Sequence, residues 1–266
     1  MSLLHGPMEE GCIDANRVKS PARNMHWVKC EFHVHASEDQ YDVLNYSARQ
    51  LIDRAAKLGF GFLALTLHRR VHRCDQLFAY AAERGILMVP SAELQIGRAD
   101  VLVLNLSPDE LAGVRSFEDL RRLRAKRGHS ILVIAPHPYF VIGGSMGEIL
   151  EQEIDCFDAV EICHLHTRYF DRNRKAVAVA NQAGLPLLAT SDAHELEHFG
   201  QHHSLLEIPS QQMSWEAVAV AIRAGRVRNV SPHLNTGRFL KELGFVGLRH
   251  PFRRWKKRWN SGRNPS

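Results

Sequence analysis

The sequence Trp27-Val28-Lys29-Cys30-Glu31-Phe32-His33-Val34-His35 places two histidines two positions apart at the end of an apolar run. In a β-strand successive side chains point to opposite faces, so His33 and His35 would project from the same face, about 7 Å apart along the backbone. Two imidazoles in this arrangement can hold one metal ion. The chain has 16 histidines among 266 residues, so a chance pair is the alternative. A metal site would require further ligands from elsewhere in the chain.

The composition is typical of one globular domain. A chain of 266 residues that is 45% hydrophobic can bury a large core and lies at the upper end of the single-domain range. The five cysteines are odd in number and show no C-x-x-C spacing, which indicates a reducing compartment. The first 24 residues lack the apolar run of a signal peptide, and no stretch reaches ~18 apolar residues. We therefore expect a cytoplasmic protein without a transmembrane segment.

The net charge of +5 comes from the C-terminal tail. The last 18 residues contain seven basic residues and no acid, which leaves 27 basic against 29 acidic residues in the rest of the chain. Within the tail, Phe252, Trp255 and Trp259 would share one face of a short helix that begins at Pro251. The tail could pack on the domain or on another subunit, or it could contact nucleic acid. Peripheral contact with an anionic membrane is the least favoured alternative.

Apolar runs of strand length alternate with helical segments through the body of the chain. Strands are expected at residues 27–35, 62–66, 86–90, 100–105, 131–135, 157–162, 187–189, 204–208 and 227–230. Helices are expected at residues 46–58, 76–84, 116–127, 173–182 and 214–224. This alternation indicates βα units around parallel strands, closed into a barrel or an open sheet. We expect one α/β domain over residues 27–232, with extensions at 1–26 and 233–266.

Histidines and carboxylates follow six successive predicted strands. They are His33, His35, His68, Glu93, His137, His164 or His166, Asp192 and His194. Functional groups of βα folds collect at the carboxyl ends of the strands, so these side chains should meet. Imidazole nitrogen and carboxylate oxygen suit Zn²⁺, Mn²⁺ or Fe, and the number of ligands implies two or three ions bridged by carboxylates. Bridged ions are suited to phosphoester cleavage.

The order of these residues resembles the PHP family, named for polymerase and histidinol phosphatase domains. The matching motifs are His33-Val34-His35, Thr66-Leu67-His68, Glu93, His137-Pro138, His164 and Asp192-Ala193-His194. The resemblance covers roughly residues 28–208 and implies a distorted (β/α)7 TIM-like barrel. It also implies a metal-dependent hydrolase of phosphoester bonds, a phosphatase or a nuclease that uses a metal-bound hydroxide. Its substrate would be a small phosphorylated metabolite, a nucleotide or an oligonucleotide.

The resemblance also implies roles for individual residues. A first ion would have four ligands: His33, His35, Glu93 and Asp192. Glu93 would bridge to a second ion held by His137 and His164. A third ion would be held by His68 and His194 together with Asp42, for which Asp39 is the alternative. The expected catalytic residues are His33, His35, Glu93, Asp192 and His194.

Two departures affect the expected site. Leu67 stands where the family has an Asp, which removes a polar side chain that could have oriented a ligand. His166 follows His164 on the same face of the strand, so it is an alternative ligand, a substrate contact or a solvated side chain. The expected substrate-binding residues lie just past predicted strands: Arg69, Arg70, His166 and Arg168.

Two alternatives to this interpretation exist. The first is the amidohydrolase superfamily, which also begins with H-x-H and ends with an Asp, but it usually needs a bridging Lys where the strand at residues 100–105 ends in Asn105. The second is a non-catalytic PHP scaffold that binds nucleic acid or a protein partner through the basic tail. The retained ligand positions favour the enzyme.

Overall fold

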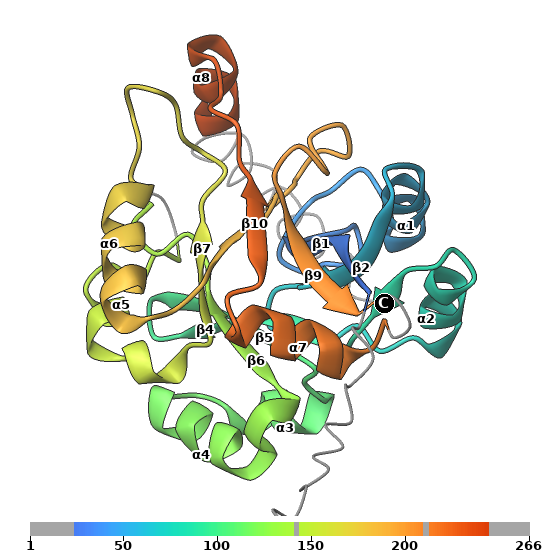
Figure 1. Ribbon diagram of the computed structural model, residues 1–266, viewed down its shortest axis with the longest axis horizontal. Coiled ribbons are helices and arrows are strands. Elements are labelled where there is room, and N and C mark those ends of the chain that lie inside the picture. The colour runs from blue at the N-terminus through green and yellow to red at the C-terminus, as the bar shows by residue number, and fades with distance from the viewer. Residues whose placement is uncertain (1–23, 141–143, 210–212, 245–266) are drawn as a thin grey trace, which may run out of the picture.

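The structure, a computed structural model, describes residues 24–140, 144–209 and 213–244 and contains two five-stranded sheets. The first sheet has the order β10-β9-β1-β2-β3 and the second β4-β5-β6-β7-β8 (Figure 1). The strands of the first sheet are β1 (Met25–Val34), β2 (Phe60–Leu65), β3 (Leu87–Met88), β9 (His203–Pro209) and β10 (Val227–Val230). Those of the second are β4 (Ser91–Ile96), β5 (Ala99–Leu104), β6 (Leu132–Ala135), β7 (Ala159–Ile162) and β8 (Leu187–Ala189). The basic aromatic segment at residues 251–259 and most of the expected N-terminal extension lie outside the described residues.

Strand β1 is the centre of the first sheet. It runs parallel to β2 and antiparallel to β9, with Met25 opposite Pro209 and Cys30 opposite Ser204. The last five residues of β1 are all buried, which agrees with the apolar run that precedes His35. The C-terminal half of β1 therefore lies in the interior of the protein, directly before His35.

The second sheet begins with a hairpin. β4 and β5 are antiparallel, with Ile96 opposite Ala99 across the turn at Gly97 and Arg98. Gly97 has φ +61°, a left-handed conformation that a glycine adopts without strain. β5 is also antiparallel to β6, whereas β6, β7 and β8 are parallel.

The predicted (β/α)7 TIM-like barrel is wrong, because both sheets are mixed and they do not join into a closed barrel. One reason is the hairpin, which replaces the helix that a parallel connection between β4 and β5 would require. A second reason is the contact between β8 and β10. It is made by a side chain and not by hydrogen bonds between the two backbones. Asn229 accepts the backbone N–H of Ala189 (2.8 Å) and donates to the carbonyl oxygen of Leu187 (2.9 Å).

The helices lie outside the sheets (Figure 1). They are α1 (Ala48–Lys57), α2 (Asp75–Ala82), α3 (Pro108–Gly113), α4 (Phe117–Arg127), α5 (Ile149–Gln152), α6 (Asn173–Ala183), α7 (Trp215–Arg223) and α8 (Thr236–Gly244). One buried cluster combines side chains of both sheets, among them Phe32, Phe62, Leu104 and Ile134. The sheets therefore share an inner core. No described helix has both the length and the apolar character needed to cross a membrane.

Candidate metal centre

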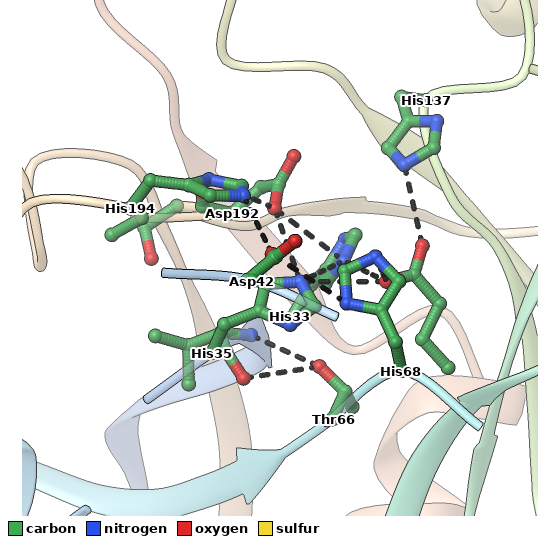
Figure 2. A network of polar contacts seen from close by, with 12 residues as sticks. His33, His35, Asp42, Thr66, His68, His137, Asp192 and His194 are labelled. Carbon is green, nitrogen blue, oxygen red and sulfur yellow. Dashed lines mark hydrogen bonds and ion pairs between the residues drawn. The ribbon is translucent and has the colours of Figure 1, made fainter. Parts of the chain in front are cut away.

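The centre forms where the ends of strands from both sheets meet. His33 and His35 lie at the end of β1, and Figure 2 shows them grouped with His68, Asp192 and His194, with His137 to one side. Backbone hydrogen bonds connect the segments: the Asp192 N–H donates to the His33 carbonyl (2.9 Å), and the Arg69 N–H to that of Glu93 (2.7 Å). The backbone thus fixes residues that are far apart in sequence.

Glu31 holds β1 against the loop that follows β8. Its buried carboxylate accepts the backbone N–H groups of Phe32 (3.0 Å), His33 (3.1 Å) and Ser191 (3.1 Å). Burial raises the pKa of Glu31 to about 7, although these hydrogen bonds act in the opposite direction. The contact places Asp192 beside the two histidines.

Three overlapping groups of the described residues could each hold a divalent ion. They are His33, His35 and Asp192; His33, Glu93 and His137; and His35, Asp39, Asp42 and His68. His33 and His35 each belong to two groups, and their Nε2 atoms lie 3.2 Å apart. The arrangement therefore suits neighbouring ions rather than a single isolated one.

Glu93 lies at the middle of the centre. Its Oε2 atom is 3.5, 3.4 and 3.3 Å from the Nε2 atoms of His33, His35 and His68, and Oε1 is 3.6 Å from Nε2 of His137. Glu93 is 2% exposed, and Oε2 makes no hydrogen bond to any described residue. A buried carboxylate oxygen without a hydrogen bond is costly, and a cation offsets that cost. The nitrogen and oxygen donors present fit divalent ions of the Zn²⁺, Mn²⁺ or Fe type.

Asp39 and Asp42 differ in their surroundings. Asp39 Oδ2 accepts the backbone N–H of His68 (2.8 Å) and Nδ1–H of the same residue (2.9 Å), and it lies 3.3 Å from Nδ1 of His35. These contacts are typical of a carboxylate that orients imidazole ligands. Asp42 Oδ2 lies 3.5 Å from Nδ1 of His68 and 3.2 Å from Nε2 of His194, so it connects the third group to His194.

Glu161 is a further residue of the centre that sequence reasoning did not select. It is fully buried in β7, and Nδ1 of His33 donates to its Oε2 at 2.8 Å. This contact leaves Nε2 of His33 directed at Glu93 and Asp192. The available signal was an acid at the centre of an otherwise apolar strand, because a buried acid needs a partner.

His164 lies apart from the ligand groups. Its Nε2 atom faces Glu242 of α8 at 3.5 Å, and His164 is in none of the groups formed by the described residues. His194 also lies outside these groups, although its Nδ1 atom is 3.8 Å from Asp192 Oδ1. The structure thus brings together most of the expected ligands and directs His164 toward α8.

The four expected substrate-binding residues fall into two places. Arg69 is exposed, with its guanidinium 5.1 Å from the ring of Tyr41, and Arg70 donates to the carbonyl of Glu38 (3.3 Å). Both therefore lie beside the loop after β1. His166 is buried, with Nδ1 2.9 Å from Nδ1 of His233 and Nε2 2.9 Å from Ser231 Oγ, and Arg168 is exposed.

Opposite charges stabilise each other within the centre. Burial acts to lower the pKa of His33, but Asp192, Glu161 and Glu93 together raise this pKa well above its ordinary value. Burial acts to raise the pKa of Glu93, but His68, His33 and His137 bring it well below its ordinary value. The carboxylates are thus held in the ionised form that binds cations, and a divalent ion would replace protons on the imidazoles.

Two residues of the centre have strained backbones. His137 has φ +29° and Asp192 has φ +41°, a region that residues with a Cβ atom rarely adopt. Strain of this kind costs on the order of 1–3 kcal/mol and concentrates at functional sites. His137 lies in the loop after β6, and Asp192 lies in the loop after β8.

Comparison with protein families gives one match. A family model described as PHP-associated matches residues 170–227, which include the loop that carries Asp192 and His194. A search of curated proteins found no match.

Solved structures match over a larger part of the chain. A two-domain protein of Bacteroides vulgatus containing a predicted PHP-like metal-dependent phosphoesterase matches with a TM-score of 0.57 and 17% identity, over 77% of this chain and 65% of that one. PsfC from Pseudomonas syringae matches with a TM-score of 0.59 and 17% identity, over 84% of this chain and 98% of that one. The lesion-specific endonuclease Q of Pyrococcus furiosus matches with a TM-score of 0.54 and 13% identity, over 77% of this chain and 58% of that one.

The PHP-associated match over residues 170–227 agrees with the resemblance seen in the sequence, and these structures, all below 25% identical, share the fold of this chain. The chain spans just under two thirds of the Bacteroides protein and less of the endonuclease.

Proposed function

We propose that this protein is a metal-dependent phosphoesterase whose centre holds two or three divalent ions. The observation that carries the proposal is the buried Oε2 atom of Glu93, which makes no hydrogen bond to a described residue and lies within 3.5 Å of three imidazole nitrogens. Such an atom would serve as a ligand of these ions. Manganese, iron and zinc all suit the donor set.

The ligands proposed for these ions follow from the three groups. His33, His35 and Asp192 would hold one ion, with Glu93 and His137 at a second and His68 with Asp42 at a third. When bound, such ions supply positive charge against phosphate oxygens and activate water. His194, which lies between Asp42 and Asp192, is proposed to complete the third site or to face the substrate.

Residues around the ligands would keep them in place. Glu161 fixes the ring of His33, and Asp39 fixes that of His68, so that the Nε2 atoms of both rings face Glu93. Arg69 and Arg70 lie beside the same loop as Asp39, where a guanidinium could contact phosphate oxygens. We keep both arginines as proposed phosphate contacts.

The first test combines metal analysis with phosphate release for the Glu93→Gln variant. The substitution keeps the size of the side chain and removes its charge, so we expect less than half of the wild-type metal content. Hydrolysis should fall on the order of 100-fold or more, beyond the roughly 10–100-fold effect of residues outside the ligand shell. Glu83→Gln, at a side chain that is 72% exposed, is the matched control and should change neither property.

A panel of esters assigns the substrate class. Release of phosphate from monoesters would identify a phosphatase, whereas shortening of a labelled oligonucleotide would identify a nuclease. A similar structure, that of endonuclease Q, contains a 27-mer duplex substrate with an abasic lesion at the active site, so nucleic acid belongs in the panel. A metal-replete protein that hydrolyses none of them would favour the scaffold interpretation.

A further inference from the structure

A cavity of about 180 Å³ adjoins the metal centre. Asp192 and His194 line its side toward the centre, and Arg238 and Glu242 of α8 line another part of its wall. A group bound in this cavity would therefore be next to the proposed ions and in contact with α8.

Helix α8 is fixed in place at the cavity. Arg238 donates to Glu242 at 2.6 Å, and Glu242 lies 3.5 Å from Nε2 of His164. The ring of Phe239 packs against that of Phe170, with 5.2 Å between their centroids. Helix α8 is thus held by polar contacts at the cavity and by a small apolar cluster that does not line it.

Three residues on the cavity wall carry buried polar atoms without a hydrogen bond to any described residue. These atoms are Oγ of Ser191, Nδ1 of His164 and Nε2 of His202. His202 is 2% exposed, and its other ring nitrogen is occupied, because Nδ1 lies 3.1 Å from Ser231 Oγ. An unpaired buried polar atom is costly, so a ligand group that reaches one of these atoms gains affinity.

The charges around the cavity favour a neutral, hydroxyl-bearing ligand. Arg238 is paired with Glu242 at 2.6 Å, and Lys241 lies 4.0 Å from Glu195. Both cations that line the described cavity therefore face a carboxylate, which disfavours a second phosphate group there. Hydroxyl groups both donate and accept, as do serine and neutral histidine.

The volume limits the size of the ligand. One water molecule needs ~10–15 Å³ of cavity volume, so 180 Å³ can hold on the order of ten or more water-sized atoms. One sugar ring of the ribose class is of this order, whereas a polymer chain is not. We propose that the cavity binds the sugar-sized, hydroxyl-bearing alcohol group of a phosphate monoester, and that His202 determines specificity for it. This inference rests on the proposed phosphoesterase function and names its substrate class.

The variant His202→Asn tests the proposal. An asparagine amide can reach Ser231 in place of Nδ1 but does not extend to the position of Nε2. His203→Asn is the matched control, because His203 is the next residue, contacts the Gly200 carbonyl through Nδ1 (3.1 Å) and does not line the cavity. The two substrates are ribose 5-phosphate and propyl phosphate, which share the scissile group and differ in their hydroxyl groups.

We expect His202→Asn to lower kcat/KM for ribose 5-phosphate about tenfold, the effect of one lost buried hydrogen bond, and to leave propyl phosphate unchanged. His203→Asn should change neither value. Binding of free ribose, followed by saturation-transfer NMR, should weaken only in His202→Asn and does not depend on hydrolysis.

The outcomes separate the two proposals. Equal losses for both esters in His202→Asn, or unchanged ribose binding in that variant, would overturn the assignment of the cavity. Ribose binding that depends on His202, in a metal-replete protein that hydrolyses no ester of the panel, would support the cavity assignment and overturn the phosphoesterase proposal. Adenosine monophosphate, which carries ribose and a base, distinguishes a nucleotide from a free sugar phosphate as the source of the ring.

Discussion

His33 shows what a local pattern can and cannot predict at the residue scale. Its alternation with His35 predicted a shared face, and the two Nε2 atoms lie 3.2 Å apart. Its partner Glu161 is 128 positions away and has no counterpart in the motif pattern. Sequence reasoning found residues that follow strands, and it missed a carboxylate inside one.

Glu161→Gln should lower metal affinity by roughly 10–100-fold, because the amide binds the Nδ1–H of His33 less strongly than a carboxylate does. A competition titration with a chromogenic chelator measures the affinity. The fold should survive, which circular dichroism can check. Wild-type affinity in a folded Glu161→Gln protein would show that this carboxylate does not support the centre.

His164 shows a contact that its position in the sequence did not indicate. It stays a predicted ligand, and its Nε2 atom faces Glu242, 78 positions later in the sequence. Glu242 belongs to a short helix that the helical pattern did not predict. The position of a histidine after a strand therefore did not reveal which neighbour it would face.

At the scale of elements, the helices and strands of the body were largely predictable, whereas their pairing was not. Glu93 was expected after a strand at residues 86–90, but Pro90 separates the short β3 from β4, and Glu93 lies within β4. The Gly97-Arg98 turn between two apolar runs is a hairpin signal that the βα interpretation passed over. Because of this hairpin, β5 runs antiparallel to β4, and the sheet is mixed instead of parallel.

Helix α8 provides a prediction at this scale. Phe239 is 8% exposed within the small apolar cluster, whereas the neighbouring Leu240 is 59% exposed. Replacing a buried phenylalanine by alanine typically costs about 3–5 kcal/mol, and here the cost should fall on α8 rather than on the sheets. Amide hydrogen exchange should therefore rise across residues 236–244 in Phe239→Ala.

Leu240→Ala is the matched control, because it removes a side chain of similar apolar character from the exposed face of the same helix. Its exchange rates should resemble those of the wild type. Equal protection of α8 in both variants would show that Phe239 does not anchor the helix.

At the scale of the whole molecule, stability should depend on pH through His202 and His203. Burial lowers the pKa of His202 to about 3 and that of His203 to about 4. Between these values and the ordinary pKa of 6.5, the unfolded chain binds protons that the folded chain does not, so both histidines destabilise the fold as pH falls. Glu31 and Asp100, with pKa values raised to about 7 and about 6 by burial, act in the opposite direction.

The effect of His202 and His203 must therefore be measured as the difference in free energy of unfolding between a variant and the wild type. The pH dependence of the wild type alone combines all four residues. Relative to the wild type, the double variant His202→Asn, His203→Asn should gain free energy of unfolding as pH falls from 6.5 to 4, by up to about 1.4 kcal/mol per unit of lowered pKa. Denaturant titrations at pH 7 and pH 5 measure this difference. A difference that is independent of pH would contradict the assignment of neutral histidines at these positions.

The pairing of β1 with β9 has a consequence for the synthesis of the chain. β1 ends at Val34, and its antiparallel neighbour begins at His203, so the strand is complete long before its partner exists. At ~5–20 residues per second, translation of the intervening segment takes roughly 10 to 30 seconds. During that time Phe32 and Val34, both buried in the folded protein, have only part of their final surroundings. The surroundings of these two side chains are therefore completed only after β9 has emerged from the ribosome.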